Sequence, residues 1–223
     1  MFMLVCLHCR NKKKRFYCIP IDLSVMADLS QYVDLTELNF LIAAACIIFN
    51  PLFWNLVARW EYHTRALSRV FGSPYTACYI LGAVLILLAI FRSHCFTEAI
   101  SSQPHSWFLK RPEFYYVGVA LVASGGILVI SSFLALGFVG TYLGDYFGIL
   151  MDKKVTGFPF NIIENPMYWG STANYLGMAF LNSSPAGLLL SALVALCYKV
   201  AILFEGTFTE KIYRNKAKAK KSR

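Results

Sequence analysis

The sequence predicts an all-α polytopic membrane protein with about four membrane helices and a cytosolic C-terminus. Three observations support this fold class. The 223-residue chain is 57% hydrophobic with a mean hydropathy of +0.54, which is more apolar than a soluble domain of ordinary composition. It contains four apolar stretches near the length of roughly 20 residues that crosses a bilayer core. Its formal charge of +9 is concentrated at the two ends of the chain.

The charge distribution excludes a basic nucleic-acid-binding globule and a disordered chain. Residues 1–15 contain five Lys or Arg and no acid, and residues 211–223 contain seven and no acid. The body between them is slightly acidic, with nine basic and twelve acidic residues. A nucleic-acid-binding fold carries its bases on the fold itself, and a disordered chain has few apolar residues. We therefore expect a membrane-embedded body with two basic ends and no nucleic-acid partner.

The first apolar stretch, Leu38–Ala58, is compatible with two structures. It follows Asp34-Leu-Thr-Glu37, which has the pattern of a helix N-terminus with an acid three residues after the cap. Pro51 removes one backbone hydrogen bond and disfavours helical geometry at Asn50. A kinked or re-entrant segment is therefore as compatible with the sequence as a straight span.

Three later stretches predict straight membrane helices. The second stretch, Phe71–Phe91, begins with a Gly-Ser-Pro sequence and ends before Arg92. The third, Tyr115–Phe138, contains no charged residue, and the fourth is Pro185–Phe204. The apolar piece 172–181 is too short to span a bilayer alone.

The basic tail sets the predicted orientation. Cytosolic loops of membrane proteins are enriched in Lys and Arg, so the tail after Phe204 predicts a cytosolic C-terminus. Counting four spans back places residues 139–184 outside the cytosol, 92–114 inside it and 59–70 outside it. The last assignment conflicts with the rule, because that loop contains three arginines.

We expect three regions along the chain. They are a basic N-terminal extension (1–30), an integral-membrane domain (31–210) and a basic cytosolic tail (211–223). The extension contains a single Cys6-x-x-Cys9 pair. Structural zinc sites of this kind use a second pair of ligands, so no metal site is expected.

Two groups of small residues favour either helix packing or close approach of a ligand. Ala120 and Ser124 form a small-xxx-small pair in the third span, which is typical of helix packing in membranes. In the alternative interpretation, the absence of side chains in this segment lets a ligand approach the backbone. Gly140, Gly144 and Gly148 recur every four residues and predict one smooth face of a helix.

Few polar residues remain as candidates for chemistry. Asn165-Pro166 predicts a turn, and the aromatic residues Tyr168 and Trp169 follow it. Aromatic faces of this kind also attract substituted ammonium ions. Glu205 lies where the last span meets the cytosol, as either a surface carboxylate or a functional one. The chain contains no HExxH, GxSxG or P-loop pattern, so short motifs do not specify a reaction.

Four long stretches carry a more specific signature than any short motif. They are FNPLFWNLVARWEYHTRALSRVFGSPYTACY (49–79), FRSHCFTEAI (91–100), SSFLALGFVGTYLGDYFGIL (131–150) and FPFNIIENPMYWGSTANYLG (158–177). Through these stretches the chain resembles the phospholipid methyltransferase family from about residue 32 to residue 216. The extension 1–30 lies outside the resemblance.

The resemblance implies three successive methyl transfers from S-adenosylmethionine to the amine of phosphatidylethanolamine, through mono- and dimethyl intermediates, to phosphatidylcholine. It implies a multi-pass protein of the endoplasmic reticulum membrane and of mitochondria-associated membranes, with a membrane phospholipid as substrate. Two alternatives stay open. One is a related membrane methyltransferase with another substrate, such as an isoprenylcysteine carboxyl group, and the other is a non-catalytic membrane protein derived from the enzyme. The oligomeric state is not specified by the sequence.

The resemblance also implies where the cofactor binds. The family has a Gly-x-Gly motif in the third span and a Glu-Glu pair after the fourth. The first motif aligns with Ala123-Ser124-Gly125, followed by Gly126, and the second aligns with Glu205-Gly206. Gly206 lacks a charge that would help to hold a cationic cofactor. We therefore expect either weaker cofactor binding than in a Glu-Glu relative or replacement of that acid from elsewhere in the chain, with activity retained.

The group that accepts the proton of the substrate amine is not specified by the resemblance. Asp145, just past the third span, and His94, just past the second, are two alternatives. A water molecule is the third. The catalytic residues are therefore left open.

Overall fold

The computed structural model describes part of the chain, namely residues 3–5, 19–21, 32–151 and 155–221, with side chains for 32–151 and 155–214. Two three-residue strands, β1 (Met3–Val5) and β2 (Ile19–Ile21), pair antiparallel ahead of the helical body. The Cys6-x-x-Cys9 pair and most of the predicted extension lie outside the described residues.

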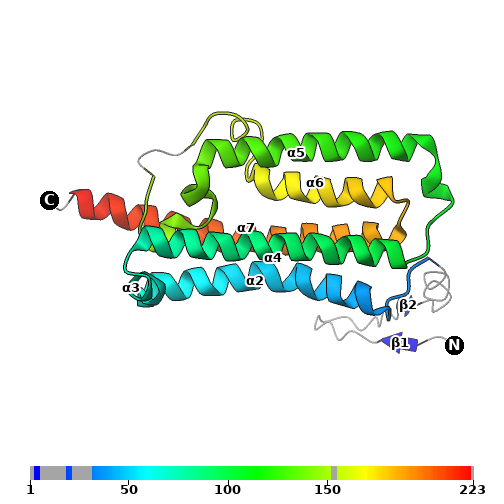
Figure 1. Ribbon diagram of the computed structural model, residues 1–223, viewed down its shortest axis with the longest axis horizontal. Coiled ribbons are helices and arrows are strands. Elements are labelled where there is room, and N and C mark those ends of the chain that lie inside the picture. Colours follow the sequence, from blue (N-terminus) through cyan, green and yellow to red (C-terminus); the bar gives the residue numbers. More distant parts are fainter. Residues whose placement is uncertain (1–2, 6–18, 22–31, 152–154, 222–223) are drawn as a thin grey trace, which may run out of the picture.

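The body is a bundle of long helices in which consecutive long helices run in roughly opposite directions (Figure 1). Among the described residues, four helices are long and apolar enough to cross a membrane, which confirms the predicted all-α polytopic class. The elements of the body are α2 (Leu38–Thr64), α3 (Ala66–Val70), α4 (Pro74–Ser102), η1 (Phe108–Lys110), α5 (Pro112–Thr141), η2 (Gly144–Phe147), α6 (Pro166–Leu181) and α7 (Pro185–Lys221).

The first apolar stretch forms one unbroken helix, α2, which continues through Pro51. At 1.5 Å per residue, its 27 residues extend about 40 Å, which exceeds the ~30 Å of a bilayer core. The re-entrant alternative is therefore not the structure found. The start of the helix also differs from the prediction, because Glu37 is itself the cap and accepts hydrogen bonds from the backbone N–H groups of Asn39 (3.0 Å) and Phe40 (2.7 Å).

The second membrane helix is longer than predicted, because Arg92 does not end it. α4 continues to Ser102, with Arg92 buried inside the bundle. Nε of Arg92 donates a hydrogen bond to the hydroxyl of Tyr175 at 3.0 Å, and the guanidinium lies 5.3 Å and 5.5 Å from the ring centroids of Tyr175 and Tyr198. Aromatic faces and a hydroxyl thus stabilise this charge within the bundle.

A further long helix, α6, changes the end of the bundle at which the loops before it lie. The sequence analysis left residues 172–181 inside a loop, because they are too short to span. In the structure, α6 starts partway along α5, runs antiparallel to it and packs between α5 and α7 (Figure 1). The chain therefore reverses direction once more than the four-span count allowed.

The loop assignments made from four spans are consequently wrong. Residues 65–73 lie at the same end of the bundle as the C-terminal part of α7, whereas residues 103–111 lie at the opposite end (Figure 1). Residues 139–184 do not form one loop, because α6 occupies 166–181. The arginines of the 59–70 segment thus lie on the same side as the basic tail, and their conflict with the positive-inside rule disappears.

We call the end with α3 and the C-terminal part of α7 the basic end. The Lys and Arg residues of this end whose side chains are described are Arg59, Arg65, Arg69, Lys211 and Arg214. The described part of the opposite end contains Lys110 and Arg111. The bases of residues 10–15 lie more than 20 residues before α2 in the sequence, beyond the roughly 15–20 residues over which the rule counts charges. The positive-inside rule therefore predicts that the basic end faces the cytosol.

α5 and α6 pack closely through glycines spaced seven residues apart on each helix. A Cβ atom on Gly118 would lie 3.0 Å from the carbonyl oxygen of Gly177, and one on Gly125 would lie 2.5 Å from that of Gly170. Contacts this short leave no room for a side chain at either α5 position. The two helices can therefore approach at these levels only because both α5 residues are glycine.

The predicted packing pair does not make this contact. Ala120 and Ser124 are both exposed on α5, and the hydroxyl of Ser124 donates a hydrogen bond to the carbonyl of Ala120 at 2.8 Å. The small-residue pattern correctly indicated close packing in this helix. The packing face, however, runs through the neighbouring positions Gly118 and Gly125.

Candidate active site

A carboxylate near the basic end is the centre of the candidate site. Glu205 lies on α7, and its Oε1 accepts hydrogen bonds from Nε1 of Trp54 at 2.5 Å and from Nδ2 of Asn55 at 3.1 Å, both on α2. Its Oε2 accepts a hydrogen bond from the hydroxyl of Tyr168, on α6, at 2.5 Å. Three donors from two helices thus hold both oxygens of this carboxylate, and none of these donors carries a positive charge.

No cationic side chain among the described residues pairs with Glu205. The ion pairs of this part of the chain, Arg111–Glu113 and Arg214–Glu210, join exposed side chains at other positions. Enclosing a carboxylate without a counter-charge costs free energy. In addition, the amide oxygen of Asn55 is buried and has no hydrogen-bond partner. A cationic ligand with N–H donors would satisfy both groups.

Three aromatic rings lie together beside this carboxylate. The ring centroid of Tyr168 is 5.0 Å from that of Tyr198 and 6.4 Å from that of Trp54, and the Trp54 and Tyr198 centroids are also 6.4 Å apart. Aromatic faces stabilise ammonium and other alkylated cations by cation–π attraction. The rings and the carboxylate therefore favour the same class of ligand.

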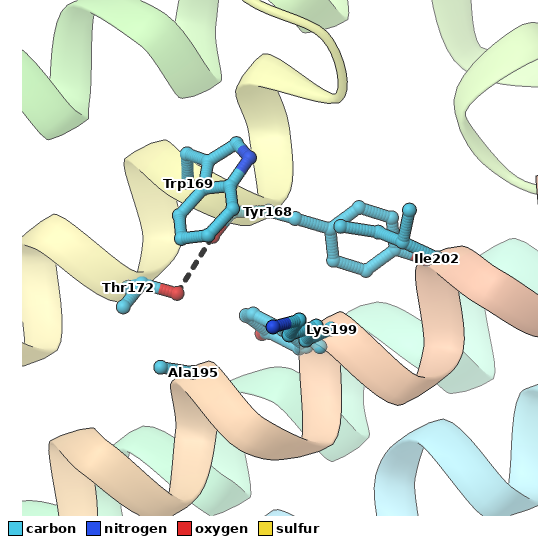
Figure 2. Close-up of a pocket in the computed structure, with 7 residues that line it drawn as sticks. Tyr168, Trp169, Thr172, Ala195, Lys199 and Ile202 are labelled. Atoms are coloured by element: carbon cyan, nitrogen blue, oxygen red, sulfur yellow. Dashed lines mark hydrogen bonds between the residues drawn. The ribbon is translucent and has the colours of Figure 1, made fainter.

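Tyr168 lies in the first turn of α6, directly after the turn predicted at Asn165-Pro166. Asn165 adopts the left-handed conformation (φ 55°), which asparagine tolerates better than most residues, and Pro166 is the first residue of the helix. Figure 2 shows Tyr168, Trp169 and Lys199 around a small niche between α6 and α7. The hydroxyl of Thr172 donates a hydrogen bond to the Tyr168 carbonyl at 2.9 Å. The niche adjoins the Glu205 site through Tyr168.

A second carboxylate, that of Asp145, lies near the first. Its Oδ2 accepts a hydrogen bond from the hydroxyl of Thr209 at 2.8 Å, one helical turn beyond Glu205 on α7, and its Oδ1 accepts from the backbone N–H of Tyr146 at 3.1 Å. The hydroxyl of Tyr146 is buried without a partner, and its ring stacks on Phe208 at 5.0 Å. Asp145 likewise makes no ion pair among the described side chains.

The turn that holds Asp145 replaces the predicted glycine face. α5 ends at Thr141, Leu143 adopts a left-handed conformation (φ 61°), and η2 follows. Gly140, Gly144 and Gly148 therefore do not lie on one helix, and the prediction was wrong. Gly144 is needed for a different reason, because a Cβ there would lie 2.7 Å from the carbonyl oxygen of Val139.

The two predicted cofactor motifs occupy different surroundings. Glu205 is in the site just described, whereas Gly206 is exposed, and a Cβ added to it would meet nothing within 4 Å. In the α5 motif, Gly125 is buried against α6, whereas Ala123 and Ser124 are exposed. Gly126 is half-buried, with open space where a Cβ would be. The structure thus joins the motifs only indirectly, because Gly125 and Glu205 both contact α6.

Several residues of the site were not predicted from the sequence. Trp54 and Asn55 had appeared only as part of the first apolar stretch, and Thr209 had not been singled out. The available signal was the polar pair Asn55 and Arg59, four residues apart, at the end of a mainly apolar stretch. His94 is exposed on α4 and does not belong to the site. No group of three His, Cys, Asp or Glu side chains in the described residues could hold a metal ion.

Fold and site together define a multi-pass helical membrane protein with a carboxylate and aromatic rings that suit a cation. The sequence profile of the family described as Phospholipid methyltransferase matches residues 114–216. The chain is 60% identical over 192 residues to phosphatidylethanolamine N-methyltransferase of Rattus norvegicus (86% of this chain, 96% of that protein) and 59% identical, with the same coverage, to that of Homo sapiens. It is 50% identical over 200 residues to phosphatidyl-N-methylethanolamine N-methyltransferase of Emericella nidulans (88% of this chain, 98% of that protein).

No solved structure matches the chain significantly. The chain belongs to the phospholipid methyltransferase family and is an enzyme embedded in a membrane. Membership of a methyltransferase family implies a methyl donor, and the apolar helices of a lipid-methylating family indicate a membrane phospholipid as substrate.

Proposed function

We propose that this protein transfers methyl groups from S-adenosylmethionine to the amine of phosphatidylethanolamine, through the mono- and dimethyl lipids, to phosphatidylcholine. The observation that carries the proposal is Glu205, a carboxylate held by three neutral donors beside aromatic rings, with no cationic partner among the described residues. Both reactants of this chemistry are cations before or during transfer, and the relatives at 59–60% identity are named for this substrate.

The Glu205 site fits the methyl donor. Bound S-adenosylmethionine would supply an electrophilic methyl group on a positively charged sulfur. The carboxylate of Glu205 and the faces of Trp54 and Tyr168 stabilise positive charge, and the free amide oxygen of Asn55 accepts an N–H donor. By fixing this charge in place, the residues supply the proximity and alignment that a displacement at carbon requires.

The motif on α5 supports the site through α6 in this proposal. Gly125 lets α6 approach α5 at Gly170, two residues after Tyr168, whose hydroxyl reaches Glu205. Ala123, Ser124 and Gly126 then remain candidate cofactor contacts only on the outer side of α5. The alanine in place of the first motif glycine lies on that exposed side and leaves the α5–α6 contact intact.

Asp145 is the proposed acceptor of the amine proton. The ammonium of the lipid must lose a proton before its nitrogen can attack, and Asp145 is a second carboxylate beside the site, held by Thr209 one turn from Glu205. His94 is exposed on another helix and is not placed to accept this proton. We further propose the endoplasmic reticulum membrane and mitochondria-associated membranes as the location, with the basic end in the cytosol, where the donor is dissolved.

The starting amine distinguishes two versions of this function. Fungal relatives at 46–50% identity are named for phosphatidyl-N-methylethanolamine, the once-methylated lipid. We favour phosphatidylethanolamine because three relatives at 58–60% identity are named for it, whereas the relatives named for the once-methylated lipid reach 50%.

The test is to incubate membranes containing the protein with labelled S-adenosylmethionine and to resolve lipid products from protein products. We expect labelled mono-, di- and trimethylated lipids from phosphatidylethanolamine. Label only in the later steps would favour the once-methylated substrate. Label in prenylated protein would indicate the isoprenylcysteine alternative, and no label at all would indicate a non-catalytic protein; either result would refute the proposal.

A further inference from the structure

We propose that Arg59 binds the phosphate of the phospholipid headgroup and thereby places the lipid amine beside Glu205. The inference rests on the proposed function and names a specificity residue for the acceptor lipid. It follows from the geometry of one side chain, from the separation of charges in the site, and from the position of that side chain along α2.

Arg59 is held against α7 without contacting a carboxylate. Its Nη2 donates a hydrogen bond to the carbonyl oxygen of Phe204 at 2.9 Å, and its guanidinium lies 4.8 Å from the ring centroid of Phe208 and 5.7 Å from that of Phe204. These contacts hold the guanidinium beside Phe204, the residue that precedes Glu205 on α7. Among the described residues, Arg59 forms no ion pair. A guanidinium has five N–H donors, so several remain for an anion.

The site therefore keeps positive and negative groups apart. Glu205 and Asp145 have no cation, and Arg59 has no anion, although all three lie in neighbouring parts of α2, α7 and η2. A zwitterionic ligand would satisfy both kinds of group at once. Phosphatidylethanolamine is such a ligand, because its phosphate is negative and its amine is positive before it is deprotonated.

The order of these groups along α2 matches the order within the headgroup. Asn55, which bonds to Glu205, precedes Arg59 by four residues, or about 6 Å along the helix axis. This separation is comparable to the two-carbon link between the phosphate and the amine. Arg59 lies on the side of Asn55 toward the basic end, where the headgroup layer is, so the phosphate would lie at the interface and the amine deeper.

Two other cations are less suited to this role. Arg92 is enclosed by Tyr175 and Tyr198 in the interior of the bundle. Lys199 lies in the niche between α6 and α7, six residues before Glu205 and hence about 9 Å farther from the basic end. The planar guanidinium of Arg59 can also bind a phosphate through two parallel hydrogen bonds, which an ammonium group cannot do.

The experiment uses the purified full chain in lipid nanodiscs and compares two acceptors, phosphatidylethanolamine and a diacyl lipid that carries a primary amine but no phosphate. For Arg59→Gln we expect the KM for phosphatidylethanolamine to rise about 10- to 100-fold, as for loss of a hydrogen-bonded ion pair. The KM for the methyl donor should stay unchanged, and the melting temperature should fall by only about a few degrees, because the contacts of Arg59 with Phe204 and Phe208 are lost. The variant should also lose the preference of the wild type for the phosphate-bearing acceptor.

Two further variants separate phosphate recognition from surface charge and from folding. Arg59→Lys keeps the charge without the planar fork and should recover only part of the lipid affinity. Arg69→Gln removes an exposed arginine of the same end that has no side-chain contact in the site, and it should leave both KM values unchanged.

Four results would overturn the inference. An unchanged lipid KM in Arg59→Gln would exclude the role, and a raised donor KM would assign Arg59 to the donor instead. A loss of phosphate preference in Lys199→Gln, with Arg59→Gln unaffected, would move the phosphate to the niche between α6 and α7. A wild type that methylates neither acceptor would refute the proposed function as well, which keeps the two failures distinguishable.

Discussion

Replacing Glu205 by Gln should weaken binding of the methyl donor while leaving the fold intact. The amide has nearly the same shape as the carboxylate, and its oxygen can still accept from Nε1 of Trp54 and Nδ2 of Asn55. Its NH₂ group replaces Oε2 and can donate to the Tyr168 hydroxyl, which turns to accept. What the substitution removes is the negative charge.

The magnitude follows from the charge-assisted contact that is lost. Hydrogen bonds to a charged group contribute about 1.5–3 kcal/mol, which corresponds to roughly a 10- to 150-fold weaker dissociation constant for the donor. The free energy of unfolding should change by less than about 1 kcal/mol, because relief of the buried charge offsets the weaker hydrogen bonds.

The assay is titration of S-adenosylmethionine against the protein in nanodiscs, together with a thermal melt. Glu210→Gln is the matched control, because Glu210 lies on the same helix but its side chain is 72% exposed and pairs with Arg214. That variant should bind the donor normally. Unchanged donor affinity in Glu205→Gln, or an equal loss in both variants, would refute the assignment of Glu205 as the group that holds the cation.

Three further predictions test the other parts of the site. Gly125→Ala should lower stability by about 1–3 kcal/mol, because its Cβ would lie 2.5 Å from a backbone carbonyl of α6. Gly126→Ala is the control and should have no effect, because the space beside it is open. A raised donor KM for Gly125→Ala without a change in the thermal melt would instead indicate direct contact with the cofactor. Gly206→Glu should tighten donor binding, because the position is exposed and restores the second acid of the family motif; an unchanged titration would discard that reasoning. Asp145→Asn should lower kcat by about 100-fold or more and flatten its pH dependence, while His94→Gln should behave as the wild type; the opposite pattern would make His94 the proton acceptor.

The helical class and the membrane character could be predicted because they depend on composition and on the length of apolar stretches. The end of the bundle at which each loop lies could not be predicted, because it depends on α6, whose 16 residues fall below the length of a spanning helix. α6 is stable in the bundle because glycines let it pack closely against α5. Such tertiary packing leaves only a weak trace in hydropathy. The same limit applies to Arg92. In the sequence this charge predicted the end of a span, whereas in the structure it is buried against Tyr175 and Tyr198.

The candidate site was accessible from the sequence only in part. Glu205 and Tyr168 were singled out because an isolated acid and a turn followed by aromatics are visible along the chain. Their contact joins positions 37 residues apart and depends on the α6–α7 packing, which no local pattern reports. Trp54 and Asn55 come from α2, about 150 residues before Glu205, and in sequence they resemble ordinary residues of a membrane span.

The most direct test of the central claim is mass spectrometry of the lipids after purified protein is incubated with S-adenosylmethionine in nanodiscs of phosphatidylethanolamine. For the wild type we expect the mono- and dimethyl lipids to appear first and phosphatidylcholine to follow. At a donor concentration near the wild-type KM, Glu205→Gln should form all three far more slowly. Wild-type protein that leaves phosphatidylethanolamine unmethylated, or Glu205→Gln that methylates it at the wild-type rate, would contradict the account.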